Sequence, residues 1–335
     1  MLKKVRLGFI GSGGIVRAHL EHGLKDFPDV EFAGWCDLDE KVAAARRDEV
    51  GGKGQVYIEA EKMLDEARPD AVYIMLPPFA HGLVEDLVIE RKLPFFIEKP
   101  VAIDMRTASR VMEGVRKNKL LTSVGYMNRY RASTLRTRAL LAKQKPVIMH
   151  GGWIGGGPSA SSPIWSWWVK KDKSGGQLLE QTTHTIDLAR FLFGEVAQVY
   201  AVAVRDRRSR PDYYTIEDAS MVQLTFANGA AANLYSSCST AVGGGVTLTA
   251  WGTDLKAEFT GWEHSVKLFL PNGEQTTIPG ENNIFALEDR AFIDSVKAGR
   301  NKGILATYED GFKATAIACA ANDSMATGKI IKLDL

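Results

Sequence analysis

The sequence predicts an α/β protein of two domains. The first is a doubly wound parallel sheet, and the second is an α+β domain with a large open, mainly antiparallel sheet flanked by helices. Three observations support this prediction. The first third of the 335-residue chain alternates short apolar strands with amphipathic helices. That alternation stops after about residue 125, and successive strands then follow one another from Val196 to Ile278 without intervening helices.

The N-terminal part contains six predicted strands, which helices separate. The strands are expected at Val5–Ile10, Val30–Cys36, Val56–Tyr57, Ala71–Leu76, Pro94–Ile97 and Leu121–Tyr126. The helices are expected at Ile15–Phe27, Glu40–Glu49, Glu59–Ala67, His81–Arg91 and Met105–Asn118. Such alternation implies right-handed crossovers and a sheet covered on both faces. We expect this domain to span residues 1–124.

The remaining residues, 125–335, are predicted to form the second domain. The dipeptides Asn228-Gly229 and Asn272-Gly273 are typical of tight hairpin turns, so the strands around them are expected to pair antiparallel. A last short strand is expected at the end of the chain, and the last helix could pack back on the first domain. Helices are expected at Ser133–Leu141, as one continuous helix at Gln177–Phe193, and at Phe285–Lys297 and Asp310–Ala326.

Composition excludes several classes of protein. The chain has 42 Lys and Arg against 40 Asp and Glu, so its net charge of +2 favours neither nucleic acid nor an anionic membrane as a partner. No apolar run approaches the roughly 18 residues that a membrane helix needs. The three cysteines, Cys36, Cys238 and Cys319, form neither a disulfide framework nor a metal-ligand spacing. We therefore expect a reduced, cytoplasmic compartment.

A glycine-rich turn, Gly11-Ser12-Gly13-Gly14-Ile15, joins the first predicted strand to the first helix. In a dinucleotide site, the first glycine makes the tight turn and the second lets the backbone approach the pyrophosphate, which then binds at the helix N-terminus. Val16 stands where a third small residue is usual. Glycine turns between a strand and a helix are common, but this one opens a βαβ unit, which is the context that cofactor binding requires.

Asp37 stands at the end of the second predicted strand. A carboxylate at this place accepts hydrogen bonds from the ribose hydroxyls of NAD. The alternative is a helix N-cap before Glu40, because Asp is a common capping residue. Together with the glycine turn, we favour the cofactor role and predict NAD rather than NADP.

Two further strand ends of the same sheet carry candidate residues. One is Leu76-Pro77-Pro78 with His81 beyond it, and the other is Glu98-Lys99-Pro100. Open parallel sheets bind ligands at the carboxyl ends of their strands, which places Lys99 at the binding edge. Lys99 could instead be an ordinary surface lysine, and Pro77-Pro78 could simply end the strand before the next helix.

In the second domain, Glu180, His184 and Asp187 follow Gly175-Gly176 at spacings of four and three residues. On one continuous helix they share a face. An ordinary solvated helix face explains the pattern equally well, and three such side chains could also bind zinc. No fourth ligand is evident, so we predict no metal.

The second domain also has a tryptophan-rich stretch. Trp153, Trp165, Trp167 and Trp168 surround a glycine-rich segment. Aromatic faces pack against the apolar side of sugar rings, so these residues could line a substrate pocket. A place in the core or at a subunit interface is an equal alternative.

These motifs together resemble the Gfo/Idh/MocA oxidoreductase family, named after glucose–fructose oxidoreductase, inositol dehydrogenase and a rhizopine-catabolism protein. The resemblance covers nearly the whole chain. It includes the glycine turn with His19, Asp37, Glu98-Lys99-Pro100, the segment Gly125–Arg129 and the helix with His184 and Asp187. It implies a Rossmann domain that binds NAD and a second domain that binds a hydroxylated, sugar-like substrate.

The resemblance also implies roles for individual residues. Lys99 would orient the substrate hydroxyl and His184 would act as the general base, a task that suits the near-neutral pKa of histidine. Glu180 departs from the family pattern, because relatives similar to inositol dehydrogenase usually carry Asp one turn before this histidine. From its spacing of four residues, we expect Glu180 to set the properties of His184. The expected cofactor-binding residues are Gly11, Gly13, Gly14, Ile15, Asp37, Leu76, Pro77, His81, Glu98, Lys99 and Asn128. The expected substrate-binding residues are Lys99, Tyr126, Trp153, Trp167, Thr183, His184 and Asp187.

Three functions remain open at this point. The first is an NAD-dependent dehydrogenase of a sugar, polyol or sugar derivative. The second is an epimerase or glycoside-cleaving enzyme that oxidises and then re-reduces the same molecule with a retained NAD. The third is a non-catalytic regulator, which would have no need of both Lys99 and His184. A flat antiparallel sheet leaves one face to cover, so a homodimer or homotetramer is expected.

Overall fold

The computed structural model describes residues 4–207, 209–242 and 244–335. Its chain divides into two compact units. The first contains residues 4–102, 106–127 and 283–312, and the second contains 103–105, 128–282 and 313–335. Residues near the C-terminus therefore contribute to the first unit as well as to the second.

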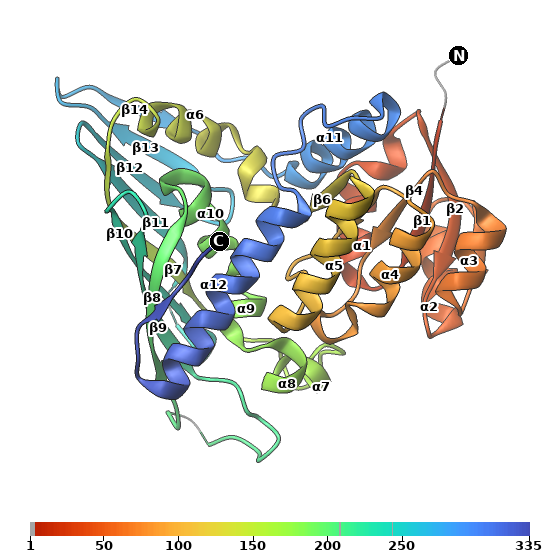
Figure 1. Ribbon diagram of the computed structural model, residues 1–335, viewed down its shortest axis with the longest axis horizontal. Helices are drawn as coiled ribbons and strands as arrows, with labels where there is room; N and C mark the ends of the chain where they lie inside the picture. The colour runs from red at the N-terminus through yellow and green to blue at the C-terminus, as the bar shows by residue number, and fades with distance from the viewer. Residues whose placement is uncertain (1–3, 208, 243) are drawn as a thin grey trace. The chain divides into compact units, whose positions relative to one another are not determined.

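The first unit is built on a six-stranded sheet in the order β3-β2-β1-β4-β5-β6, in which all strands are parallel. This confirms the predicted doubly wound sheet (Figure 1). Its strands are β1 (Val5–Ile10), β2 (Val30–Cys36), β3 (Gln55–Tyr57), β4 (Ala71–Ile74), β5 (Phe95–Ile97) and β6 (Thr122–Val124). Its helices are α1 (Gly14–His22), α2 (Glu40–Glu49), α3 (Ala60–Ala67), α4 (Leu83–Glu90), α5 (Met105–Asn118, whose first residue belongs to the second unit) and α11 (Ile284–Ala298).

Two predicted helices of the first unit begin or end differently from the expectation. The first ends at His22, because Gly23 interrupts it before a short 3₁₀ turn, Leu24–Asp26. The helix expected from His81 begins at Leu83, after a 3₁₀ turn at Pro78–Ala80 that the prolines initiate. Val16 is fully buried and packs in the core between α1 and the sheet.

The second unit is built on a nine-stranded sheet in the order β14-β13-β12-β11-β7-β10-β9-β8-β15. Only β7 and β10 pair parallel among these strands, which confirms the predicted mainly antiparallel sheet. The two Asn-Gly dipeptides lie in the β9–β10 and β13–β14 connections, with Gly229 and Gly273 in the left-handed region. The strands are β7 (Pro146–Ile154), β8 (Val196–Val204), β9 (Ala219–Phe226), β10 (Ala231–Ser237), β11 (Gly245–Gly252), β12 (Leu255–Thr260), β13 (Ser265–Phe269), β14 (Gln275–Ile278) and β15 (Ile331–Lys332).

The helices of the second unit lie along one face of this sheet in Figure 1. Side chains that alternate along the strands and point to this face, such as Val199, Leu224 and Leu248, are buried. The helices are α6 (Ala132–Leu141), α7 (Trp165–Trp168), α8 (Lys171–Ser174), α9 (Gln177–Glu180), α10 (Thr183–Phe193) and the larger part of α12 (Tyr308–Thr327). A 3₁₀ turn, Met127–Tyr130, precedes α6.

The opposite face of the nine-stranded sheet exposes apolar side chains. Tyr200 and Val202 point to it from β8, Met221 pairs with Val202 from β9, and Ile148 lies on β7. Each of the four is between 38% and 48% exposed. A sheet with one buried and one solvent-facing side usually alternates apolar with polar residues, so this apolar face is unusual for a monomer.

Candidate active site

The turn after β1 gives the first helix an N-terminus without a side-chain cap. Gly11 has φ of +86°, and a Cβ added there would meet the Met75 carbonyl oxygen at 2.3 Å, so only glycine fits. Gly13 is the N-cap and makes no side-chain hydrogen bond. Among the described residues, nothing lies within 4 Å of a Cβ added at Gly13 or Gly14. Space for a ligand therefore remains beside the backbone at the start of α1, where the first N–H groups have no partner within the helix. This fits a dinucleotide pyrophosphate.

Asp37 follows β2 and supports the same turn. The Ser12 N–H donates to Asp37 Oδ2 at 2.9 Å, and the Asp39 N–H donates to Oδ1 at 3.1 Å. The alternative of an N-cap is wrong for Asp37, because the cap of α2 is Asp39, which accepts a bond from the Lys41 N–H. Carboxylate oxygens accept more than one hydrogen bond each, so Asp37 retains capacity for ribose hydroxyls.

The predicted residues that follow β4 are anchored locally. Leu76 and Pro77 are half-buried. His81 is buried, and its Nδ1 lies 2.6 Å from Glu85 Oε1 in the first turn of α4. The Gly82 N–H donates to the other oxygen of Glu85. This carboxylate therefore fixes both the His81 ring and the start of the helix.

Glu98 fixes the backbone at Lys99, directly after β5. The Lys99 N–H donates to Glu98 Oε2 at 3.1 Å, and Glu98 Oε1 lies 3.2 Å from His19 Nε2. A Cβ added at Gly125 would meet Glu98 Oε1 at 2.5 Å. The glycine of the Gly125–Arg129 segment therefore leaves room for the carboxylate, and Tyr126 beside it is buried.

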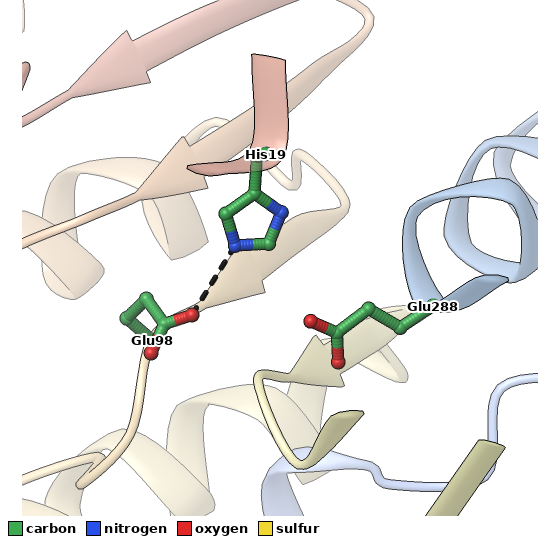
Figure 2. A group of neighbouring side chains, drawn as sticks. All are labelled: His19, Glu98 and Glu288. Carbon is green, nitrogen blue, oxygen red and sulfur yellow. Dashed lines mark hydrogen bonds and ion pairs between the residues drawn. The ribbon is translucent and has the colours of Figure 1, made fainter. Parts of the chain in front are cut away.

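A buried charge network surrounds His19. Its Nδ1 lies 2.9 and 3.0 Å from the two carboxylate oxygens of Asp289 on α11, and Tyr73 donates to Asp289 Oδ1 at 3.1 Å. Figure 2 shows Glu98 bonded to the His19 ring and the Glu288 carboxylate pointing toward both. His19, Asp289 and Glu288 are fully buried. The network therefore links α1, β4, the end of β5 and α11.

The charges of these groups follow from their contacts. Burial opposes the charged form of His19, but the charge and hydrogen bond of Asp289, with the bond to Glu98, raise the pKa of His19 well above its ordinary value. Burial raises the pKa of Glu288 well above its ordinary value, and the charges of Glu98 and Asp289 add to this effect. Burial also raises the pKa of Asp289, against the lowering effect of His19. These shifts favour the imidazolium form of His19 and the neutral form of Glu288.

His19, Glu98 and Glu288 bring potential metal-ligand atoms within 4.8 Å of one another. An imidazolium has no lone pair to offer a metal ion, and both ring nitrogens of His19 already face carboxylates. We therefore interpret this group as an ion-pair network. The zinc alternative considered for Glu180, His184 and Asp187 gains no support, because their ligand atoms do not form such a group among the described residues.

The second unit contains a pocket on the helix-covered face of its sheet. Of the predicted residues, it brings together Asn128, Trp153 and His184. The other lining residues come from α10, β11, the β12–β13 turn and the residue after α9. They are Gln181, Thr185, Leu188, Val246, Leu248, Trp262 and His264. Sequence reasoning missed these residues, and no motif distinguishes Trp262 or His264 from an ordinary turn.

The predicted continuous helix at 177–193 is wrong. Helix α9 ends at Glu180, and α10 begins at Thr183. The Gln177 carbonyl accepts bonds from both the Gln181 and the Thr182 N–H, which breaks the regular ladder. Two consecutive β-branched threonines at this point favour the break, since they are weak helix formers. The regular spacing expected between Glu180 and His184 therefore does not apply.

Glu180 contacts the tryptophan-rich segment. The Trp168 indole N–H donates to Glu180 Oε2 at 2.9 Å. Trp168 belongs to a small core with Val169, Ile216 and Cys238, against which Trp165 and Trp167 pack. Trp153 also packs there, and it is the tryptophan of the four that lines the pocket. The stretch is therefore part of a core, and Trp153 connects that core to the pocket.

Asp187 is held by an arginine inside the second unit. Arg129 makes two bonds to its carboxylate, at 2.8 and 2.6 Å, and both side chains are almost fully buried. The guanidinium groups of Arg129 and Arg138 lie 4.8 and 4.0 Å from the ring of Phe191, which lies one turn after Asp187 on α10. These cation–π contacts explain an aromatic residue on the same helix face as His184 and Asp187. Thr183, at the start of α10, is buried. The contacts of Asp187 and Thr183 with substrate stay predictions.

Two family models match the chain. One describes an oxidoreductase family with an NAD-binding Rossmann fold and matches residues 5–126, and the other describes a Gfo/Idh/MocA C-terminal domain and matches residues 145–258. The chain belongs to the Gfo/Idh/MocA oxidoreductase family. The resemblance, the NAD cofactor and the assignment as an NAD(P)-dependent oxidoreductase are thereby confirmed.

Relatives match over almost the full chain. An uncharacterized oxidoreductase of Bacillus subtilis is 25% identical, covering 100% of this chain and 98% of its own length. The myo-inositol 2-dehydrogenase of Thermotoga maritima is 23% identical, and the match covers 98% of this chain and 99% of that protein. Among solved structures, levoglucosan dehydrogenase in complex with NADH and levoglucosan has a TM-score of 0.88 at 18% identity, covering 99% and 100%. Within the described residues, no helix has the length and apolar character to cross a membrane.

The His19 network gives a stability prediction for this family member. Asp289→Asn should lower the free energy of unfolding by about 3–5 kcal/mol, because it leaves a buried imidazolium without its main counter-charge. Asp294→Asn, on the same helix, is the matched control. Asp294 pairs with Arg290 at a half-exposed position, so its loss should cost less than about 1 kcal/mol. Urea denaturation of both variants measures the difference. Equal effects would contradict the charged network.

Proposed function

We propose that the protein is an NAD-dependent dehydrogenase that oxidises a hydroxyl group of a sugar, polyol or sugar derivative. The observation that supports this most is the pocket of the second unit. It is lined by the aromatic side chains of Trp153 and Trp262 and by the polar side chains of His184, Asn128 and Gln181. Sugar-binding sites need this combination, because a sugar ring has an apolar face and an edge of hydroxyl groups. The names of the inositol and levoglucosan dehydrogenases among the relatives agree with it.

Oxidation of a hydroxyl to a carbonyl removes one hydride and one proton. NAD, when bound, accepts the hydride. His184 accepts the proton as general base, since it lies in the pocket and histidine is the side chain best suited to proton transfer near neutral pH. Lys99 orients the hydroxyl with its ammonium group. Glu98 supports this role by fixing the backbone of Lys99.

A screen of sugars and polyols with NAD tests the proposal. We expect steady production of NADH with at least one polyhydroxylated ring, such as an inositol isomer or levoglucosan. Stoichiometric NADH that stays bound while the substrate isomerises or is cleaved would instead identify a redox-neutral enzyme. NAD binding without any turnover would identify a regulator.

Substitutions of Lys99 and His184 should separate catalysis from cofactor binding. Lys99→Met should abolish turnover and His184→Ala should lower kcat by a factor on the order of 10²–10⁴, the usual contribution of a general base. Both variants should bind NAD normally, because the glycine turn and Asp37 make the main expected cofactor contacts. Steady-state kinetics and calorimetry measure the two properties. Loss of NAD binding in Lys99→Met would mean that Lys99 acts mainly on the cofactor rather than on the substrate.

Asp37 should determine the preference for NAD. Its carboxylate would lie beside the 2′-phosphate of NADP, and like charges repel. Wild-type kcat/KM should therefore be higher with NAD, and Asp37→Ser should narrow the ratio between the two cofactors. Asp39→Ser is a control two residues away that keeps a capping oxygen for α2 and should retain the preference. A wild-type preference for NADP would overturn the assignment of Asp37.

We also propose that copies of the chain form a homodimer or homotetramer through the apolar open face of the nine-stranded sheet. Its exposed Tyr200, Val202 and Met221 would be buried by a second copy. Light scattering should find an oligomer for the wild type and a smaller species for Met221→Lys. Leu83→Lys, at an exposed apolar position of the first unit, is the control and should leave the assembly intact. A monomeric wild type would exclude this interface.

A further inference from the structure

The pocket of the second unit contains a second histidine that the proposed proton transfer does not use. His264 lies in the turn between β12 and β13 and lines the same pocket as His184. Its side chain is buried, at 2% exposure, and its ring packs edge-on against Phe259. Its Nδ1 has no hydrogen-bond partner among the described residues. A buried polar atom without a partner is costly, and a ligand in the pocket can remove that cost by pairing with it.

A buried arginine fixes this histidine in place. The Arg131 guanidinium, which is fully buried, donates to the Trp262 carbonyl at 2.8 Å and to the Glu263 carbonyl at 2.6 Å. It also donates to Asn128 Oδ1 at 2.8 Å and to the Glu281 carbonyl. One side chain therefore holds the turn that carries Trp262 and His264 together with the Asn128 amide, and all three line the pocket.

The backbone of His264 itself is in an uncommon conformation. Its φ is +52°, in the left-handed region that residues other than glycine seldom adopt. The bonds from Arg131 to the two preceding carbonyls stabilise the turn in which this conformation occurs.

The environment of His264 keeps its ring neutral. Burial, together with the charge of Arg131, lowers the pKa of His264 to about 3. His184 lines the same pocket, and the charges of Glu263 and Glu281 act on Arg131. A neutral imidazole has one N–H donor and one acceptor nitrogen. It therefore suits a neutral hydroxyl group better than an anion or a cation.

We propose that His264 is a specificity-determining residue that hydrogen-bonds one hydroxyl of a polyhydroxylated substrate, other than the hydroxyl that is oxidised. Arg131 is its positioning residue. This inference rests on the proposed function for the presence of a sugar or polyol in the pocket. A site built to pair with a hydroxyl rejects analogues that lack it, because its own buried polar group is then left unpaired. His264 thus selects among rings that differ at one carbon.

The test compares His264 variants on a substrate and its deoxy analogues. The probe is the ring most rapidly oxidised in a panel of myo-inositol, scyllo-inositol and levoglucosan, with its monodeoxy analogues. His264→Phe should lower kcat/KM for the parent ring by at least about tenfold, the usual effect of an unpaired buried group. For the analogue that lacks the recognised hydroxyl, the substitution should change kcat/KM by less than about twofold. For the other analogues, kcat/KM should fall by the same factor as for the parent ring. An equal fall in kcat/KM for the parent ring and for every analogue would overturn the proposal.

A second variant keeps the test valid if His264→Phe folds poorly. His264→Asn retains a donor and an acceptor, and asparagine tolerates the left-handed backbone. This variant should recover part of the preference for the parent ring over the analogue that lacks the recognised hydroxyl. Failure of both variants to alter discrimination would overturn the proposal. Arg131→Lys should raise KM for the ring, because a lysine cannot make all the bonds that hold the Trp262–His264 turn.

A binding measurement separates this inference from the proposed activity. The chain has six histidines, so ring resonances of the NADH-saturated protein can be followed on addition of each polyol, with the His264 signal assigned by its absence in His264→Asn. A shift of that signal without turnover would support the inference and contradict the dehydrogenase proposal. Turnover with an unshifted His264 signal would overturn the inference alone.

Discussion

The first unit depends on one buried ion pair, between His19 and Asp289. The imidazolium joins the helix that follows the glycine turn to a helix near the C-terminus, and Tyr73 on β4 donates to the same Asp289 carboxylate. A charged group excluded from water requires a close counter-charge, so its partners cannot move apart without a large cost. The final packing of the N-terminal sheet therefore includes α11, although that helix lies near the C-terminus.

The same ion pair reaches the candidate active site through Glu98. The Glu98 carboxylate pairs with His19 Nε2 and also accepts a hydrogen bond from the Lys99 N–H. One side chain therefore connects the buried ion pair to the backbone of Lys99. Gly125 is part of this arrangement because any side chain there would displace the carboxylate. The Glu-Lys-Pro motif thus has two functions that sequence alone does not separate. Its glutamate faces the core, whereas its lysine is half-buried at the strand end.

In the second unit, two arginines close in sequence perform a comparable task. Arg129 holds Asp187 on α10, and Arg131 holds the Trp262–His264 turn and Asn128. Planar guanidinium groups make several directed bonds at once, which suits them to fix separate segments around a pocket. The two arginines thus hold segments that form the pocket wall, in which His264 Nδ1 has no partner among the described residues. Rigid support of this kind is what selection among similar hydroxylated rings requires.

The sequence by itself determined the two sheets, the glycine turn, the hairpins and the family, because these follow from local periodicity and from residues needed for special backbone conformations. Tertiary structure decided the rest. The break at Gln181–Thr182, the capture of Glu180 by Trp168, the pairing of Arg129 with Asp187 and the entry of His264 into the pocket all depend on contacts between distant segments. The role of Asp37 was also open in the sequence, because Asp37 and Asp39 could each cap α2. In the structure Asp39 is the cap, and Asp37 accepts a hydrogen bond from the glycine turn. A buried polar side chain must find its partner in three dimensions, and sequence spacing does not specify which partner lies within reach.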